Sequence, residues 1–113
     1  MNIVYKIAHK ALWETAEAAG VFTGAEIDVQ DGYIHFSTAA QVAETARRHF
    51  LNRDDLLLIA IDGDKIDLVW EPSRGGDLFP HLYADLNMDA VIGVIPMSPD
   101  NHGIPTPEGG FPA

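Results

Sequence analysis

The hydrophobic periodicity of this chain changes several times along its length, and these changes limit its fold more than any other feature. Residues 2–8 alternate with a period of two, which is typical of a strand, and residues 10–19 carry apolar side chains at helical spacing until Gly20. Residues 33–37 alternate again, a second helical pattern follows them, and most later periodic segments are strand-like. This order favours an α+β domain over a doubly wound parallel sheet.

Turn and capping signals predict where several of these elements begin and end. Residues 21–31 show no clear period, so we expect a connector that ends in an Asp-Gly turn. A second helix is expected to begin at Thr38, because Gln41 completes a capping-box pattern three residues later. That helix should end near residues 51–52.

The second half of the sequence predicts mainly strands. Residues 56–62 form an apolar run of strand length, and Asp62-Gly63 is typical of a hairpin turn into a strand at residues 66–71. A last strand is expected at residues 90–97. Residues 98–113 are rich in proline and glycine, so we expect an irregular or mobile tail after a single α+β domain at residues 1–97.

Composition and charge exclude several classes of protein. The chain has 113 residues, enough for one domain with a core, and it has no cysteine, which excludes disulfides and thiolate metal sites. Its formal net charge is −10, and so acidic a protein repels nucleic acid and anionic membranes. It shows neither a signal peptide nor a run of about 20 apolar residues. We therefore expect a cytoplasmic protein that binds a small molecule, catalyses a reaction on one or binds another protein.

The alternating segment at residues 33–37 places three polar side chains on one face. Ile34 and Phe36 take the core side, which leaves Tyr33, His35 and Ser37 together on the opposite side. This row forms either a solvated sheet surface or the floor of a cleft. We favour the cleft, because solvated strand faces more often carry Thr, Lys and Glu.

Four further residues lie where they could complete such a cleft. His9 ends the first strand, and His81 lies within an aromatic patch that could form either a binding wall or a core corner. Glu71 ends a strand just before a glycine-containing loop, and it could stabilise a cation or act as a base. Arg74 in that loop could contact an anionic group of a ligand. Each of the four also has an ordinary structural explanation at a strand end or in a surface loop.

A histidine metal site is an alternative use of the same residues. His9, His35 and His81 could hold zinc and leave one coordination position open. No H-x-x-x-H or H-E-x-x-H spacing supports this alternative, and no G-x-S-x-G motif supports a serine nucleophile. We expect no metal, and we do not place His49 or His102 in the site.

Four motifs in the same order resemble a small bacterial family, domain of unknown function 952. They are Tyr5-Lys6-Ile7-Ala8-His9, Gly32-Tyr33-Ile34-His35-Phe36-Ser37-Thr38, Val69-Trp70-Glu71 and Phe79-Pro80-His81-Leu82-Tyr83. The resemblance covers about residues 3–96. That family is similar in turn to the ADP-ribosyltransferase fold, and most of all to RNA 2′-phosphotransferases of the KptA kind.

This second resemblance implies a fold and a ligand. The fold would be an α+β domain with a split, curved sheet and two helices in its N-terminal half. His9 would contact the adenosine-side ribose of NAD, while His35 and Ser37 would line the nicotinamide-ribose region. Glu71 would replace a catalytic glutamate, although the Glu-x-Glu or Gln-x-Glu pair of ADP-ribosyltransferases is absent here. The basic residues with which the phosphotransferases hold tRNA are also few.

Together, these observations predict a protein that binds NAD or an ADP-ribosyl nucleotide and transfers or hydrolyses ADP-ribose, with NAD as co-substrate. The alternative is a non-catalytic module that binds a small ligand or a protein, which the missing Glu-x-Glu pair favours. The expected catalytic residues are His35 and Glu71, and the expected ligand-binding residues are His9, Tyr33, Ser37, Arg74 and His81.

Overall fold

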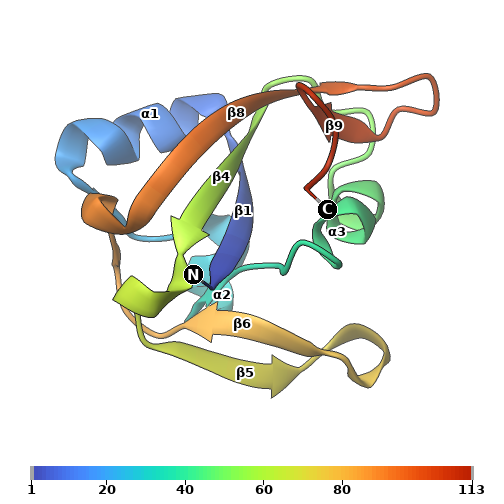
Figure 1. Cartoon of the computed structure of the whole chain (residues 1–113). Coiled ribbons are helices and arrows are strands. Elements are labelled where there is room, and N and C mark those ends of the chain that lie inside the picture. The colour runs from blue at the N-terminus through green and yellow to red at the C-terminus, as the bar shows by residue number, and fades with distance from the viewer. Residues whose placement is uncertain (1, 113) are drawn as a thin grey trace.

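The structure is a computed structural model that describes residues 2–112, except for the side chain of Arg74 (Figure 1). Within that range it contains three α-helices: α1 (Lys10–Ala19), α2 (Glu26–Asp31) and α3 (Val42–His49). The strands are β1 (Ile3–His9), β2 (Val21–Phe22), β3 (Ile34–His35), β4 (Leu56–Asp62), β5 (Leu68–Pro72), β6 (Leu78–Leu82), β7 (Leu86–Asn87), β8 (Val91–Pro99) and β9 (Pro105–Pro107). Short 3₁₀ helices occupy Gly63–Lys65, Arg74–Gly76 and Met88–Ala90.

Two antiparallel sheets dominate the fold. The larger has the strand order β1-β4-β8-β9, with Tyr5 opposite Ala60 and Ile59 opposite Val94. The smaller has the order β3-β6-β5, and β2 pairs with β7 separately. In Figure 1 the larger sheet curls between α1 and α3, and β5 and β6 lie across one end of it. A single bridge between Tyr5 and Ser37 joins the segment after β3 to the larger sheet.

The larger sheet has a hydrophobic cluster on each face, because β4 is buried from both sides. Ile59 and Ile61 belong to the cluster that includes Trp13 of α1, whereas Leu58 packs with Val42 of α3. A strand that is covered on both faces reads as a continuous apolar run, and this explains the sequence of residues 56–62. The predicted α+β class, the helix at residues 10–19 and the strand at residues 56–62 are confirmed.

The region at residues 21–31 is not the connector that we expected, and the described chain has three helices rather than two. It contains β2 and α2, and α2 has an inverted pattern of burial. Ile27 and Val29 are 52% and 68% exposed, whereas the charged Asp28 is 2% exposed. Because polar and apolar side chains have exchanged their usual places, no amphipathic period was visible.

The segment at residues 33–42 also differs from its prediction. The strand is limited to β3, and α3 begins at Val42 instead of Thr38. The capping-box pattern instead stabilises a turn, in which the Thr38 amide donates to the Gln41 side-chain oxygen over 3.1 Å. Within β3 and just after it, Ile34 and Phe36 are buried at 3% exposure each, as the alternation predicted.

Two predictions for the second half were wrong. β4 and β5 do not form a hairpin, because they belong to different sheets and Gly63–Lys65 forms a 3₁₀ helix between them. The C-terminal segment is not irregular throughout, since β9 pairs with the end of β8. Proline is tolerated there because β9 is an edge strand whose outer amides need no partner.

Among the described residues, no helix combines the length and the apolarity needed to cross a bilayer.

Candidate functional site

A cavity of about 510 Å³ lies between the two sheets. Its walls come from β1, α2, α3, β6 and the segment that contains β3. The wall residues that carry polar or aromatic groups include Tyr5, Asp31, His35, Ser37, Phe50 and His81. Small-molecule sites typically enclose about 300–1,000 Å³ and combine apolar walls with a few polar groups, so this cavity has the size and composition of a ligand site.

The buried carboxylate of Asp28 organises one side of the cavity. Its oxygens accept hydrogen bonds from Lys6 Nζ at 2.9 Å, from the Ala25 amide at 2.7 Å and from the His35 amide at 3.1 Å, and the ion pair brings Lys6 Nζ to 2.8 Å from Oδ2. The ring of His35 adds a fourth hydrogen bond, between its Nδ1 and Asp28 Oδ1 over 2.6 Å. A carboxylate this deeply buried is stable only when it is paired and hydrogen-bonded, and Asp28 meets both conditions.

The pKa values of this pair have opposing causes. Burial raises the pKa of Asp28, but the hydrogen bonds from His35 and Lys6 outweigh it and hold that pKa at about 2. Burial lowers the pKa of Lys6, and the charge of Asp28 opposes that shift. The short Lys6–Asp28 contact therefore keeps both groups ionised within the wall of the cavity.

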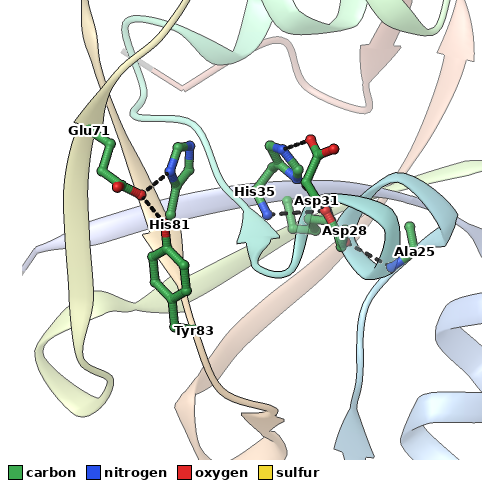
Figure 2. A network of polar contacts seen from close by, with 8 residues as sticks. Ala25, Asp28, Asp31, His35, Glu71, His81 and Tyr83 are labelled. Atoms are coloured by element: carbon green, nitrogen blue, oxygen red, sulfur yellow. Dashed lines mark hydrogen bonds and ion pairs between the residues drawn. The ribbon is translucent and has the colours of Figure 1, made fainter.

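Both ring nitrogens of His35 contact carboxylates. Nδ1 lies 2.6 Å from Asp28, and Nε2 lies 3.0 Å from Asp31 Oδ2 (Figure 2). An ionised carboxylate only accepts hydrogen bonds, so the ring can donate to both carboxylates at once only when it carries two protons. These two contacts fix the orientation of the His35 ring.

His81 forms a second histidine–carboxylate pair. Its side chain is 5% exposed, and its Nδ1 lies 2.8 Å from Glu71 Oε1. The same oxygen accepts a 2.6 Å hydrogen bond from the hydroxyl of Tyr83. These bonds from Tyr83 and His81 lower the pKa of Glu71, and the carboxylate in turn raises the pKa of Tyr83 to about 12. Figure 2 shows Glu71 on one side of the His81 ring and the second ring nitrogen turned away from it.

Aromatic stacking joins the two histidines. The ring of Tyr33 stacks on His81 with centroids 4.1 Å apart, and it contacts His35 at 4.6 Å. The two imidazoles are 5.4 Å apart in an edge-to-face arrangement. Burial and the nearby carboxylates of Asp31 and Glu71 raise the pKa of Tyr33, which favours its neutral form. Tyr33 therefore supports the histidines sterically.

The structure brings together three of the seven predicted site residues in the wall of the cavity: His35, Ser37 and His81. The Ser37 hydroxyl is hydrogen-bonded to Thr45 over 2.9 Å. Tyr33 and Glu71 contact the cavity histidines without belonging to its wall.

The other two predicted residues are not part of this arrangement. The His9 ring pairs with Asp55 at 3.2 Å, and it lies edge-to-face against Phe50, a residue of the cavity wall, with ring centroids 6.5 Å apart. The predicted role of the Arg74 side chain falls outside the described residues. Among the described residues, no group of three His, Cys, Asp or Glu side chains is placed to hold a metal ion.

Sequence reasoning missed Lys6, Asp28, Asp31 and Tyr83. Lys6 and Asp28 are charged residues in a strand and a supposed connector, and charged residues are rarely buried, so the default expectation placed them in solvent. Asp31 was assigned to a turn. Tyr83 lies beside His81 in the predicted aromatic patch, and this proximity was the one available signal.

The ionisation of Asp28 makes the free energy of unfolding depend on pH under acidic conditions. Its folded-state pKa of about 2 lies below the ordinary 3.8, so the unfolded chain binds more protons. Its contribution is about 2 kcal/mol, since one pKa unit corresponds to about 1.36 kcal/mol, and it is complete above about pH 5 and mostly lost as the pH falls toward 2. We expect urea unfolding between pH 5 and pH 2 to show this loss. In Asp28→Asn, the free energy of unfolding should change less steeply with pH over the same range.

High salt reduces the contribution of another acid to that measurement, and the comparison with Asp28→Asn isolates Asp28. The exposed Glu44 also has a pKa lowered to about 2 by hydrogen bonds from Arg47 and Arg48, but salt screens such surface pairs. A slope that is unchanged in Asp28→Asn at high salt would contradict the assignment.

Comparisons with known proteins place the chain in a family. Residues 7–94 match the family described as "Protein of unknown function (DUF952)". No curated protein matches the sequence. The X-ray structure of protein CC0527 from Caulobacter crescentus is similar, with a TM-score of 0.89 and 40% identity, covering 92% of this chain and 93% of that chain. The solution NMR structure of CC0527 has a TM-score of 0.82 at 40% identity and covers 93% and 92%. With most of its length matched by the family and its fold shared with CC0527, the chain belongs to the DUF952 family.

Proposed function

We propose that the cavity binds a nucleotide of the NAD or ADP-ribose class and that His81 exchanges a proton with the bound molecule. The observation that carries this proposal is the environment of His81. Its ring is almost fully buried in the cavity wall, and its Nδ1 is hydrogen-bonded to Glu71. Nε2 makes no hydrogen bond to any part of the chain that the structure describes.

This arrangement suits a general acid–base catalyst. Glu71 accepts a hydrogen bond from Nδ1, so in the neutral ring the lone pair lies at Nε2. A catalytic histidine needs a partner that fixes its tautomer and orientation, and Glu71 supplies that partner. Stacking on Tyr33 holds the plane of the ring. Glu71 is therefore proposed as a positioning residue behind His81 and not as the group that contacts substrate.

His35 is proposed to bind the ligand, because it lines the cavity and its position is fixed by Asp28. The Ser37 hydroxyl and the aromatic walls of Tyr5 and Phe50 provide further polar and flat contacts. The nucleotide class rests on the resemblance of the family to RNA 2′-phosphotransferases of the KptA kind and to the ADP-ribosyltransferase fold. The cavity volume supports occupation by one end of such a molecule.

The reaction that this site could perform is hydrolysis of the nicotinamide–ribose bond. Water oxygen forms a bond to ribose C1′ while the C1′–N bond breaks and its electron pair leaves with nicotinamide. The proton of the water passes to His81 Nε2 and then to solvent. The products are ADP-ribose, nicotinamide and one proton, so atoms and charge balance.

Titration with NAD under NMR observation tests the proposal. We expect saturable shifts at His35, His81 and their neighbours, and slow release of nicotinamide that is detectable in a single-turnover assay. His81→Asn should keep a donor toward Glu71 but lose the nitrogen available to the ligand. Its turnover should therefore fall by about 10²–10⁴ with binding retained.

His102→Asn is the matched control, because His102 lies in the exposed turn before β9. This variant should behave as the wild type. An absence of shifts at millimolar NAD would refute the nucleotide class, and unchanged turnover in His81→Asn would refute the role of His81.

A second candidate function is ligand binding without catalysis. The observation that favours it is that Asp28 and Asp31 occupy both nitrogens of His35, while the predicted catalytic Glu71 lies behind His81. Saturable NAD binding without any nicotinamide release would support this function.

A further inference from the structure

Asp31 is the carboxylate that lines the cavity. It is the last residue of α2 and is followed by Gly32, whose φ of 87° ends the helix in the left-handed region. Its side chain is 37% exposed, and Oδ2 accepts from His35 Nε2 at 3.0 Å. Its other oxygen has no hydrogen-bond partner among the side chains and backbone groups that the structure describes. Figure 2 shows that oxygen turned away from the histidine ring.

The charges around the cavity favour a cation over an anion. Lys6 is the one described lysine or arginine in the wall, and it pairs with Asp28. Asp31 lines the cavity as well, and Glu71 lies behind His81, so with neutral histidines the described carboxylates outnumber the described cations by two. The chain as a whole, with a formal net charge of −10, adds a field of the same sign.

The remaining wall supplies aromatic rings and an unsatisfied acceptor. Tyr5 and Phe50 line the cavity, and the faces of such rings attract cations. The Nε2 lone pair of the buried His81 adds a further electron-rich group that lacks a partner in the described structure. A carboxylate, an imidazole lone pair and aromatic rings around one cavity are the groups that recognise an organic cation.

We infer that the cavity selects a flat organic cation, such as an N-alkylated pyridinium ring, and that Asp31 is the residue that recognises its charge. The inference rests on the proposed function in that it names which end of the ligand enters the cavity. Asp31 is then a specificity-determining residue, distinct from Glu71, which positions His81.

The test compares two probes that differ mainly in charge. Nicotinamide is neutral, and 1-methylnicotinamide carries a positive ring of nearly the same size. Titration under NMR observation should show that the wild type binds the cation roughly tenfold more tightly than the neutral probe. In Asp31→Asn that preference should fall to roughly twofold or less, because the amide accepts from His35 but carries no charge.

Two further variants make the result specific. Asp31→Glu restores the charge and should recover most of the preference, so a folding defect cannot be mistaken for loss of recognition. Glu17→Gln removes one charge from α1, which contributes nothing to the described cavity wall, and it should leave the preference unchanged.

The outcomes separate the inference from the proposed function. Equal binding of the two probes, or the same preference in Asp31→Asn as in the wild type, would overturn the inference even if NAD binds. Binding of neither probe would overturn it as well. A preference for the cation that depends on Asp31, without any binding of NAD, would uphold the inference and refute the nucleotide class.

Discussion

Replacing Asp28 with asparagine lowers the free energy of unfolding by about 3–5 kcal/mol, because it leaves the ammonium group of Lys6 buried without a countercharge. Lys6 and Asp28 are 7% and 1% exposed in their side chains, and their charged atoms are 2.8 Å apart. The asparagine oxygen can still accept from the Ala25 amide, so the loss reports mainly the broken ion pair. Urea unfolding at neutral pH measures it.

The double variant Lys6→Met with Asp28→Asn distinguishes the pair from other causes. Removing both charges should recover most of the lost stability, since a buried pair can often be replaced by groups of similar volume at little cost. Asp54→Asn, at an exposed acid, should stay within about 0.5 kcal/mol of the wild type. If the double variant is as unstable as the single one, the ion pair is not the reason for the loss.

Replacing Trp13 with alanine should destabilise the fold by about 3–5 kcal/mol, which is typical of a large aromatic removed from a core. Trp13 is 0% exposed and lies in the cluster between α1 and the larger sheet. Its ring is 5.3 Å from that of Phe22 of β2. Thermal or urea unfolding would measure the change, and a loss below about 1.5 kcal/mol would show that this cluster is not tightly packed.

Phenylalanine at the same position is the informative comparison. The indole Nε1 of Trp13 is buried and has no hydrogen-bond partner in the described part of the chain. An unsatisfied buried donor costs about 1–3 kcal/mol, and Trp13→Phe removes it. This gain offsets part of the lost packing, so we expect a net change below about 1.5 kcal/mol. A loss as large as that of Trp13→Ala would mean that the indole nitrogen does have a partner.

The part of the site on β3 could be predicted because its signal is local. Strand alternation places His35 and Ser37 on the side opposite Ile34 and Phe36, and in the structure both polar residues line a cavity. The aromatic patch around His81 was ambiguous between a core corner and a binding wall. The His81 ring is buried, and it also lines the cavity.

The network behind those residues could not be predicted, because it depends on contacts between distant segments. Lys6 and Asp28 are 22 positions apart in the sequence, and neither has a pattern that distinguishes it from a solvated charge. Glu71 was expected to contact a ligand, but its hydrogen bond to His81, which follows from the pairing of β5 with β6, was not foreseen. His9 ends β1 as expected, but at the end of the strand it meets Asp55.

The sequence by itself determined the α+β class, the helix of residues 10–19, the buried strand of residues 56–62 and the polar row that follows residue 32. All of these depend on spacing within one segment, where side-chain direction repeats with the backbone. Only the tertiary structure decided that β4 and β5 belong to different sheets, that the proline-rich end adds a strand, and that Asp28 sits buried between Lys6 and His35. Those outcomes depend on which segments meet and on the stabilisation of buried charges by partners far along the chain, and local periodicity contains no information about either.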